Sequence, residues 1–145
     1  MDRAKKAAKI MAEGKMNCAQ TVLTTFCEEL GLQKDLALGL AGGFGGGMAR
    51  TNNVCGAVSG ACMVLGLRQY PGITEPRQRL EKVYSLVNEF NKRFTASHGS
   101  VRCTDLVGYD LSTMDGLNTA RGNNAFFTIC PKFVEDAVSL LETLQ

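Results

Sequence analysis

The residues of this 145-residue chain with the clearest potential for chemistry are its six cysteines, Cys18, Cys27, Cys55, Cys62, Cys103 and Cys130. A deprotonated cysteine is both a nucleophile and a metal ligand, so such a set can support thiol–disulfide exchange or metal binding. Cytosolic chains normally keep their cysteines reduced, so the even number favours redox or metal chemistry over a disulfide framework. The sequence contains no CxxC. The spacing therefore indicates neither a thioredoxin-type pair nor a ribbon-type zinc site.

Helical geometry separates two of the six cysteines from the others. Cys18 and Cys27 are nine residues apart on one predicted helix and therefore point in opposite directions. Cys55 and Cys62 face the same way, but they lie about 10 Å apart along the helix axis, too far for a shared metal. Cys27 and Cys62 lie inside apolar helical stripes, so we interpret them as small apolar core residues.

The other four cysteines share a position at or near a predicted helix start. Their neighbours are Asn17 before Cys18, Asn53 two residues before Cys55, Thr104 and Asp105 after Cys103, and Pro131 after Cys130. Unpaired amides and the positive end of the helix dipole stabilise a thiolate there and lower its pKa. We expect Cys18, Cys55, Cys103 and Cys130 to meet in one site, either as redox-active thiols or as metal ligands.

The elements that must position these cysteines are all predicted to be helices. Apolar residues recur at helical spacing in five segments, Arg3 to Glu13, Asn17 to Leu30, Val54 to Leu67, Arg77 to Thr95 and Pro131 to the C-terminus. Asn52 and Asn53 are expected to cap the third segment, which is apolar all round and should run through the middle of the molecule. Residues 97–124 predict two single-turn helices between loops. No alternating strand pattern of useful length occurs, so we predict an all-α, single-domain multi-helix bundle over residues 1–145.

A glycine-rich tract separates the second and third cysteine-bearing segments. Five glycines surround Phe44 between Gly42 and Gly47, and each costs a helix about 1 kcal/mol relative to alanine. The tract should be a loop or an unravelling helix end. We expect Gly46, Gly47 and Gly56 to let the backbone pass close to the cysteines and to contribute to cofactor binding. A phosphate-binding loop is the weaker interpretation, because GxxxxGK[ST] is absent.

Charge and hydropathy exclude several classes of partner. Sixteen basic and fourteen acidic residues leave a net charge of +2, without a basic run that would attract nucleic acid. No apolar run approaches the roughly 20 residues needed to span a bilayer, and the N-terminus lacks a signal-peptide pattern. We therefore expect a cytoplasmic protein without membrane insertion.

Three stretches, NCAQTVL, GGFGGGMAR and CGAVSGA, resemble the family named for its pattern C_GCAxxG_C_C and described as redox-active. The likeness covers nearly the whole chain. It implies that Cys18 is the first family cysteine, that Cys55 lies in the signature with Gly56 and Gly60, and that Cys103 and Cys130 are the later two.

The resemblance also has implications for cofactors. Family members are similar to the non-haem part of split-Soret cytochromes, which implies that the four cysteines could hold a [2Fe–2S] cluster or another metal such as zinc. The chain has no CxxCH and a single histidine, His98, so no covalent haem is expected. We interpret His98 as a residue at the C-terminal end of a helix.

Two functions from different classes remain open at this point. The first is a redox protein with an unknown redox partner, using the four cysteines for electron transfer or thiol–disulfide chemistry, with or without an iron–sulfur cluster. The alternative is a non-catalytic helical binding module, associated with membrane transport machinery, whose cysteines are structural. The sequence leaves open whether the chain is an enzyme. The small face formed by Gly56 and Gly60 fits either a homodimer or a neighbouring helix of the same chain.

Overall fold

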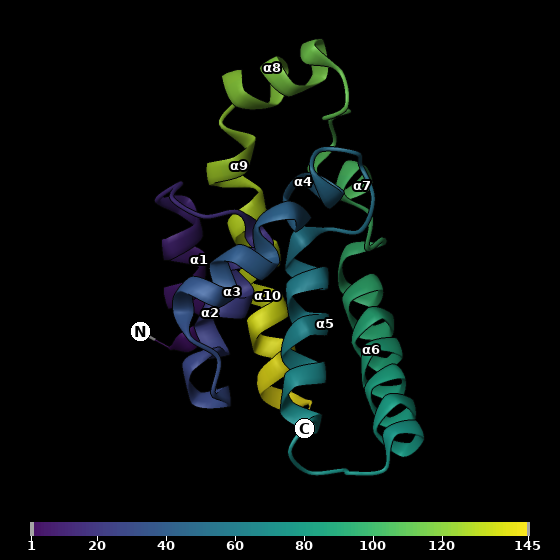
Figure 1. The fold of residues 1–145 in the computed structure, drawn as a ribbon. Coiled ribbons are helices and arrows are strands. Elements are labelled where there is room, and N and C mark those ends of the chain that lie inside the picture. Colours follow the sequence, from purple (N-terminus) through teal and green to yellow (C-terminus); the bar gives the residue numbers. More distant parts are fainter. Residues whose placement is uncertain (1, 145) are drawn as a thin grey trace.

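The computed structural model describes residues 2–144, and their regular structure is helical (Figure 1). In chain order the elements are α1 (Arg3–Ala12), α2 (Cys18–Phe26), η1 (Glu28–Leu30), α3 (Lys34–Ala41), η2 (Gly42–Phe44), α4 (Gly45–Met48), α5 (Gly56–Gln69), α6 (Pro76–His98), α7 (Cys103–Val107), α8 (Met114–Gly122), α9 (Ala125–Thr128) and α10 (Cys130–Thr143). The described residues contain no strand, only an isolated bridge between Val54 and Arg102. The predicted all-α multi-helix fold is confirmed.

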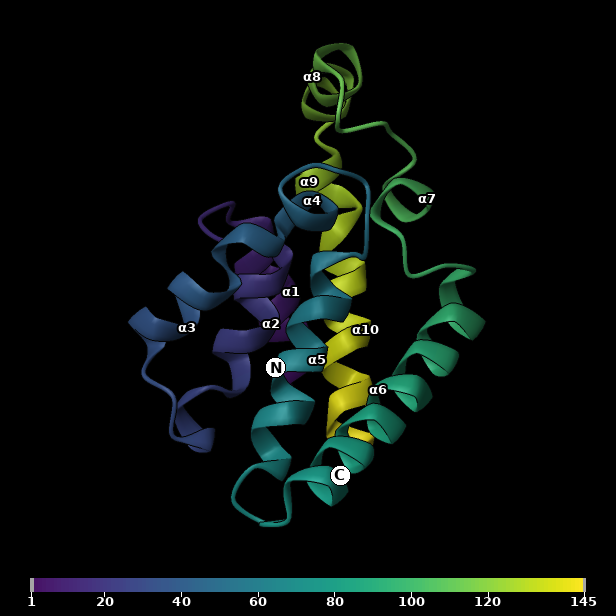
Figure 2. The ribbon, with the colours of Figure 1, turned by 45° about the vertical axis from the view of Figure 1, so that its right-hand side comes forward.

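Helix α5 is the centre of the bundle. It packs against α2, α10 and α6, while α1 lies along α10 and α3 covers the outside of α2 (Figures 1 and 2). Small and branched side chains of α5 are fully buried, among them Ala57, Val58 and Val64. A helix that is apolar on nearly every face must be surrounded by other elements, so the prediction of a central apolar helix is confirmed.

Helix caps follow the sequence in one case and depart from it in another. Asn17 caps α2 as predicted, with its side-chain oxygen accepting from the Gln20 amide at 2.9 Å and Gln20 bonding back to the Asn17 amide at 3.0 Å. The prediction that Asn52 or Asn53 caps α5 is wrong, because α5 begins at Gly56 with Cys55 as its N-cap residue. Asn52 instead binds the chain around Asp110, donating to its carboxylate at 2.7 Å.

Residues 97–124 are more helical than predicted. They contain the five-residue α7 and the nine-residue α8, and α9 begins directly after them. The expectation of two short helices between loops is confirmed, but that of a single turn is wrong for α8. Thr113 caps α8 by accepting from the Gly116 amide at 3.0 Å. Glycines at both ends of α8 weaken its sequence signal, although tertiary contacts support the helix.

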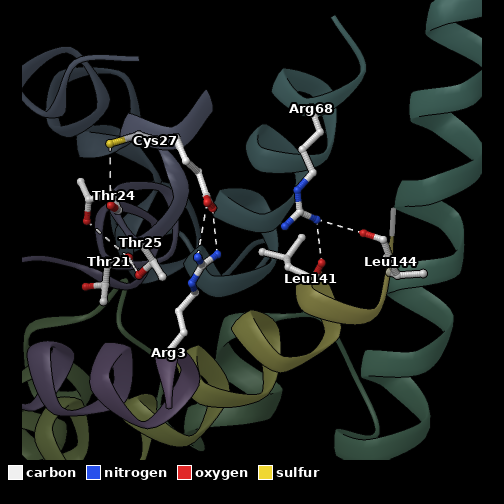
Figure 3. A network of polar contacts seen from close by, with 9 residues as sticks. Arg3, Thr21, Thr24, Thr25, Cys27, Arg68, Leu141 and Leu144 are labelled. Carbon is white, nitrogen blue, oxygen red and sulfur yellow. Dashed lines mark hydrogen bonds and ion pairs between the residues drawn. The ribbon is translucent and has the colours of Figure 1, made fainter. Parts of the chain in front are cut away.

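The side chain of Arg68, on α5, binds the C-terminal end of α10 (Figure 3). Arg68 donates to the carbonyls of Leu141 and Leu144 at 2.6 and 2.9 Å, which satisfies the C-terminal end of α10. Its guanidinium also lies over the ring of Phe26. Cys27 lies beside this network, with its Sγ 3.7 Å from the carbonyl of Thr24, and is fully buried.

His98 is the last residue of α6, as predicted, and left-handed Gly99 ends the helix. Its Nε2 lies 2.7 Å from Oδ2 of Asp136 on α10, so the pair links α6 to α10. Within residues 2–144, no helix combines the length and the apolar character needed to cross a membrane.

Candidate functional site

Four cysteines line one cavity of about 510 Å³. The helices α4, α7 and α9, which lie at one end of the bundle, show where this part of the chain is (Figures 1 and 2). The four cysteines are Cys18, Cys55, Cys103 and Cys130, each no more than 8% exposed. Cys18, Cys103 and Cys130 are the first residues of α2, α7 and α10, and Cys55 is the N-cap residue of α5. The predicted helix-start positions are therefore confirmed.

The two remaining cysteines lie outside this cavity. Cys27 is at the far end of α2, and Cys62 is on a half-buried face of α5. Neither side chain lines the cavity. The separation of Cys27 and Cys62 from the other four by helical geometry is confirmed.

An isolated antiparallel bridge brings Cys55 and Cys103 together. The Cys55 amide donates to the Val101 carbonyl at 2.8 Å, and the Cys103 amide donates to the Asn53 carbonyl at 2.7 Å. Cys55 and Cys103 each follow directly after one of the two bridging residues, Val54 and Arg102. Successive side chains of extended backbone point to opposite faces, so Cys55 and Cys103 share the face opposite the bridging pair. That face is the cavity wall, whereas the bridging residue Val54 is exposed.

A close contact between α2 and α5 places Cys18 next to the start of α5. A Cβ atom on Gly56 would lie 2.9 Å from the Ala19 amide nitrogen and 3.1 Å from Cβ of Cys18. Only glycine permits this approach. The small face of α5, including Gly60, is therefore covered by α2 of the same chain. Of the two predicted neighbours for this face, a second chain or another helix of the same chain, the structure supports the helix.

The glycine-rich tract forms a wall of the cavity in an unusual conformation. Five consecutive residues from Gly46 to Arg50 have φ between 55° and 67°, a left-handed turn. The three that are not glycine each cost about 1–2 kcal/mol. Two hydrogen bonds to the carbonyl of Gly47, at 2.9 Å each, hold the turn, one from the amide of Asn53 and one from the hydroxyl of Thr51. Strain of this kind is concentrated at functional sites.

The three glycines predicted at the site differ in their positions. Gly46 and Gly56 line the cavity. Gly47 is buried behind the wall, where a Cβ atom would lie 2.7 Å from Cβ of Cys103. The expectation that the tract is not stable helix is confirmed by its left-handed residues.

The thiols of Cys18 and Cys130 line the same cavity, and each shifts the pKa of the other. Interaction with the Cys18 side chain lowers the pKa of Cys130, against the opposing effect of burial. Interaction with Cys130, then burial and the neighbouring cysteines, raises the pKa of Cys18 well above its ordinary value. Of the two thiols, Cys130 is therefore the one that ionises at the lower pH.

Cys55 and Cys103 behave differently from the pair. Burial raises the pKa of Cys55 to about 11, although the amides of Ala57 and Val58 oppose the shift. Burial and the neighbouring Cys55 and Cys130 raise the pKa of Cys103 to about 12. The prediction that all four helix starts lower the cysteine pKa is therefore wrong for three of them. Desolvation outweighs the helix dipole at Cys55 and Cys103, and at Cys18 the interaction with Cys130 is the largest cause, followed by desolvation.

Sequence patterns missed several residues of the cavity. Lys15 and Arg121 lie at its edge, and Phe126, Phe127 and Phe133 form an aromatic wall. Arg121, Phe126 and Phe127 belong to the α8–α9 region, whose helices the sequence signal described poorly. Arg50, which lines the cavity, was recognisable only as a cation close to Cys55 in the chain.

No three Cys, His, Asp or Glu side chains in residues 2–144 are grouped so that they could hold a metal ion. A tetrahedral thiolate site needs sulfur atoms about 2.3 Å from a common centre. As arranged, the four thiols do not fit that requirement. Binding of zinc or of an iron–sulfur cluster stays a prediction that the arrangement of the thiols does not support.

The fold and the site define an all-α protein with a buried cluster of cysteines. The family model described as "Putative redox-active protein (C_GCAxxG_C_C)" matches residues 16–144, and the chain belongs to this family. In this chain the signature reads Cys55-Gly56-Ala57-Val58-Ser59-Gly60, so glycine follows the cysteine at the contact between α5 and α2. Searches of curated proteins and of solved structures found no match.

Proposed function

We propose that this chain is a thiol–disulfide redox protein in which Cys130 is the attacking thiolate and Cys18 is the resolving thiol. The observation that carries the proposal is the placement of both thiols on one cavity wall, as the first residues of α2 and α10, where their interaction raises the pKa of Cys18 and lowers the pKa of Cys130. A thiolate at a helix start beside a protonated thiol is the arrangement that disulfide exchange requires.

The exchange takes place in two balanced steps. The Cys130 thiolate attacks a substrate disulfide, so that one S–S bond breaks, a mixed disulfide forms and one thiolate leaves. Cys18 then loses its proton to the leaving thiolate and attacks the Cys130 sulfur, which releases the second group as a thiolate. The protein gains one disulfide while the substrate disulfide takes up two electrons and the Cys18 proton, and the second thiolate takes its proton from water. A dithiol reductant reverses the steps.

Cys55 and Cys103 stay protonated through this cycle at neutral pH, because their pKa values are about 11 and about 12. They add no negative charge next to the Cys130 thiolate. Their part is to fill the wall of the cavity with neutral groups, so only the Cys18–Cys130 pair exchanges.

The test is to equilibrate the protein in buffers of reduced and oxidised dithiothreitol, alkylate the remaining thiols and map disulfides by mass spectrometry. We expect a single Cys18–Cys130 disulfide that forms in a two-electron transition. Cys18→Ser should abolish it, and the matched variant Cys62→Ser, outside the cavity, should not. A protein that stays fully reduced in oxidising buffer would refute the proposal.

A second measurement tests the alternative that the four cysteines bind an iron–sulfur cluster. Anaerobic purification followed by iron and sulfide analysis should give neither in stoichiometric amount if the cysteines work as free thiols. A stoichiometric cluster lost in Cys130→Ser would replace exchange with electron transfer through the cluster. If a variant with all four cysteines changed to serine keeps every cellular role of the chain, the non-catalytic binding module gains support instead.

A further inference from the structure

We infer that the cavity selects small disulfides that carry negative charge, such as those bearing carboxylates. The inference rests on the proposed exchange at Cys18 and Cys130 and concerns which molecules reach it. It comes from the shape of the cavity and the charges around it.

Every ionisable side chain on the cavity wall, apart from the cysteines, is a cation. Lys15, Arg50 and Arg121 line the cavity, and no aspartate or glutamate does. The three basic residues are exposed, and none takes part in the ion pairs found in residues 2–144. Their charge is therefore free to act on a ligand.

The three cations come from separate parts of the chain. Lys15 follows α1, Arg50 ends the left-handed turn, and Arg121 lies in the last turn of α8. A Cβ atom on Gly46 would lie 3.0 Å from Cγ of Arg50, so the arginine lies across the turn at the cavity edge. Cations gathered from separate elements around one concave site concentrate an anionic ligand there.

Burial of the reactive sulfur atoms restricts the size of the substrate. Cys18 and Cys130 are 8% and 6% exposed, inside a cavity of about 510 Å³. That volume is typical of small-molecule sites. Thiols this buried favour a small disulfide, which can enter the cavity, over a disulfide fixed on the surface of a folded protein.

The aromatic wall supplies the apolar part of the site. Phe126, Phe127 and Phe133 line the cavity together with the cysteines. Phe127 is 47% exposed, and its ring packs on Gly14, where a Cβ atom would lie 2.5 Å from Cε1. The methylene groups of a small disulfide can lie against these rings while its charged ends reach the cations.

The test compares three disulfides of similar size: 3,3′-dithiodipropionate, which is anionic, 2-hydroxyethyl disulfide, which is neutral, and cystamine, which is cationic. For each disulfide, the rate at which it oxidises the Cys18–Cys130 pair is divided by the rate at which the same disulfide reacts with dithiothreitol. This ratio removes differences in leaving group. We expect the anionic disulfide to react at least about tenfold faster than the cationic one at low salt. The preference should shrink in high salt as the charges are screened.

Charge reversal then identifies the residues responsible. Arg50→Glu with Arg121→Glu should reverse the order of the two charged disulfides, each compared with the neutral disulfide in the same variant. The matched control Lys82→Glu with Lys92→Glu makes the same change in net charge on exposed positions of α6, outside the cavity. It should leave the order unchanged.

The outcomes separate the inference from the proposed function. If the wild-type protein reacts equally with all three disulfides, or faster with a protein disulfide such as insulin, the selectivity is refuted while the exchange stands. If no disulfide oxidises the Cys18–Cys130 pair, the exchange fails as well. The salt dependence of the wild-type rates tests the inference even if the double variant does not fold.

Discussion

Replacing Cys18 by alanine removes the side chain whose interaction lowers the pKa of Cys130, and that pKa should rise toward its ordinary value. A hydrogen bond to a charged group contributes about 1.5–3 kcal/mol. At about 1.4 kcal/mol for each factor of ten, the thiolate fraction at neutral pH falls roughly 10- to 100-fold. A thiolate of higher pKa is intrinsically more nucleophilic, with a Brønsted slope of about 0.4–0.5, which offsets part of this loss. The net expectation is a rate of disulfide attack about 4- to 15-fold lower.

The assay is the second-order reaction of reduced protein with 2,2′-dithiodipyridine, followed by release of the pyridinethione, with the modified cysteine identified by peptide mapping. Cys18→Ser keeps a hydroxyl donor, so its rate should lie between the wild type and the alanine variant. Cys62→Ala should react at Cys130 as the wild type does. A Cys18→Ala protein whose Cys130 reacts as fast as, or faster than, the wild type would refute the interaction with Cys18 as the cause of activation.

Three further predictions concern the surroundings of the site. Gly47→Ala places a Cβ atom 2.7 Å from that of Cys103 at a φ of 67°, so chemical denaturation should show a loss of about 2–5 kcal/mol. Folding raises the pKa of Cys103 from 9.0 to about 12. The protonated thiol therefore contributes its full stabilisation below about pH 9. This stabilisation is lost as the pH rises toward about 12, because the unfolded chain ionises first. In reducing buffer, unfolding free energies at about pH 8 and about pH 11 should therefore differ by roughly 2–3 kcal/mol more in the wild type than in Cys103→Ala, and equal differences would contradict the shift. Arg68→Met removes the hydrogen bonds to the carbonyls of Leu141 and Leu144 and should cost about 1–3 kcal/mol in thermal unfolding, whereas an unchanged melting temperature would argue against that role.

The sequence predicted the longer helices well because their apolar periodicity is a local property. The segments around α1, α2, α5, α6 and α10 were all recognised from spacing, and Asn17 was recognised as a cap. The sequence predicted α8 too short, because its glycines weaken the local helix preference. It also misplaced Asn52, which could bond equally well to its own helix or to a distant loop. Only the folded chain shows that Asn52 binds Asp110.

The site was also predictable in part. Helical spacing removed Cys27 and Cys62, and the positions of the other four cysteines at helix starts followed from neighbouring cap and turn residues. The cations Lys15 and Arg121 could not be found, because no local pattern connects them to the cysteines. They reach the cavity only through the packing of α1 and of the α8–α9 region.

Local sequence was thus sufficient to establish an all-α chain whose chemistry is concentrated on four cysteines at helix starts, because caps and periodicity act over a few neighbouring residues. The tertiary structure decided which of these thiols ionises. Burial raises the pKa of Cys55 and Cys103, and interaction with the Cys18 side chain lowers the pKa of Cys130. Desolvation and contacts between distant segments exist only once the chain has folded, and at Cys18, Cys55 and Cys103 they outweigh the helix-start effect that the sequence predicted.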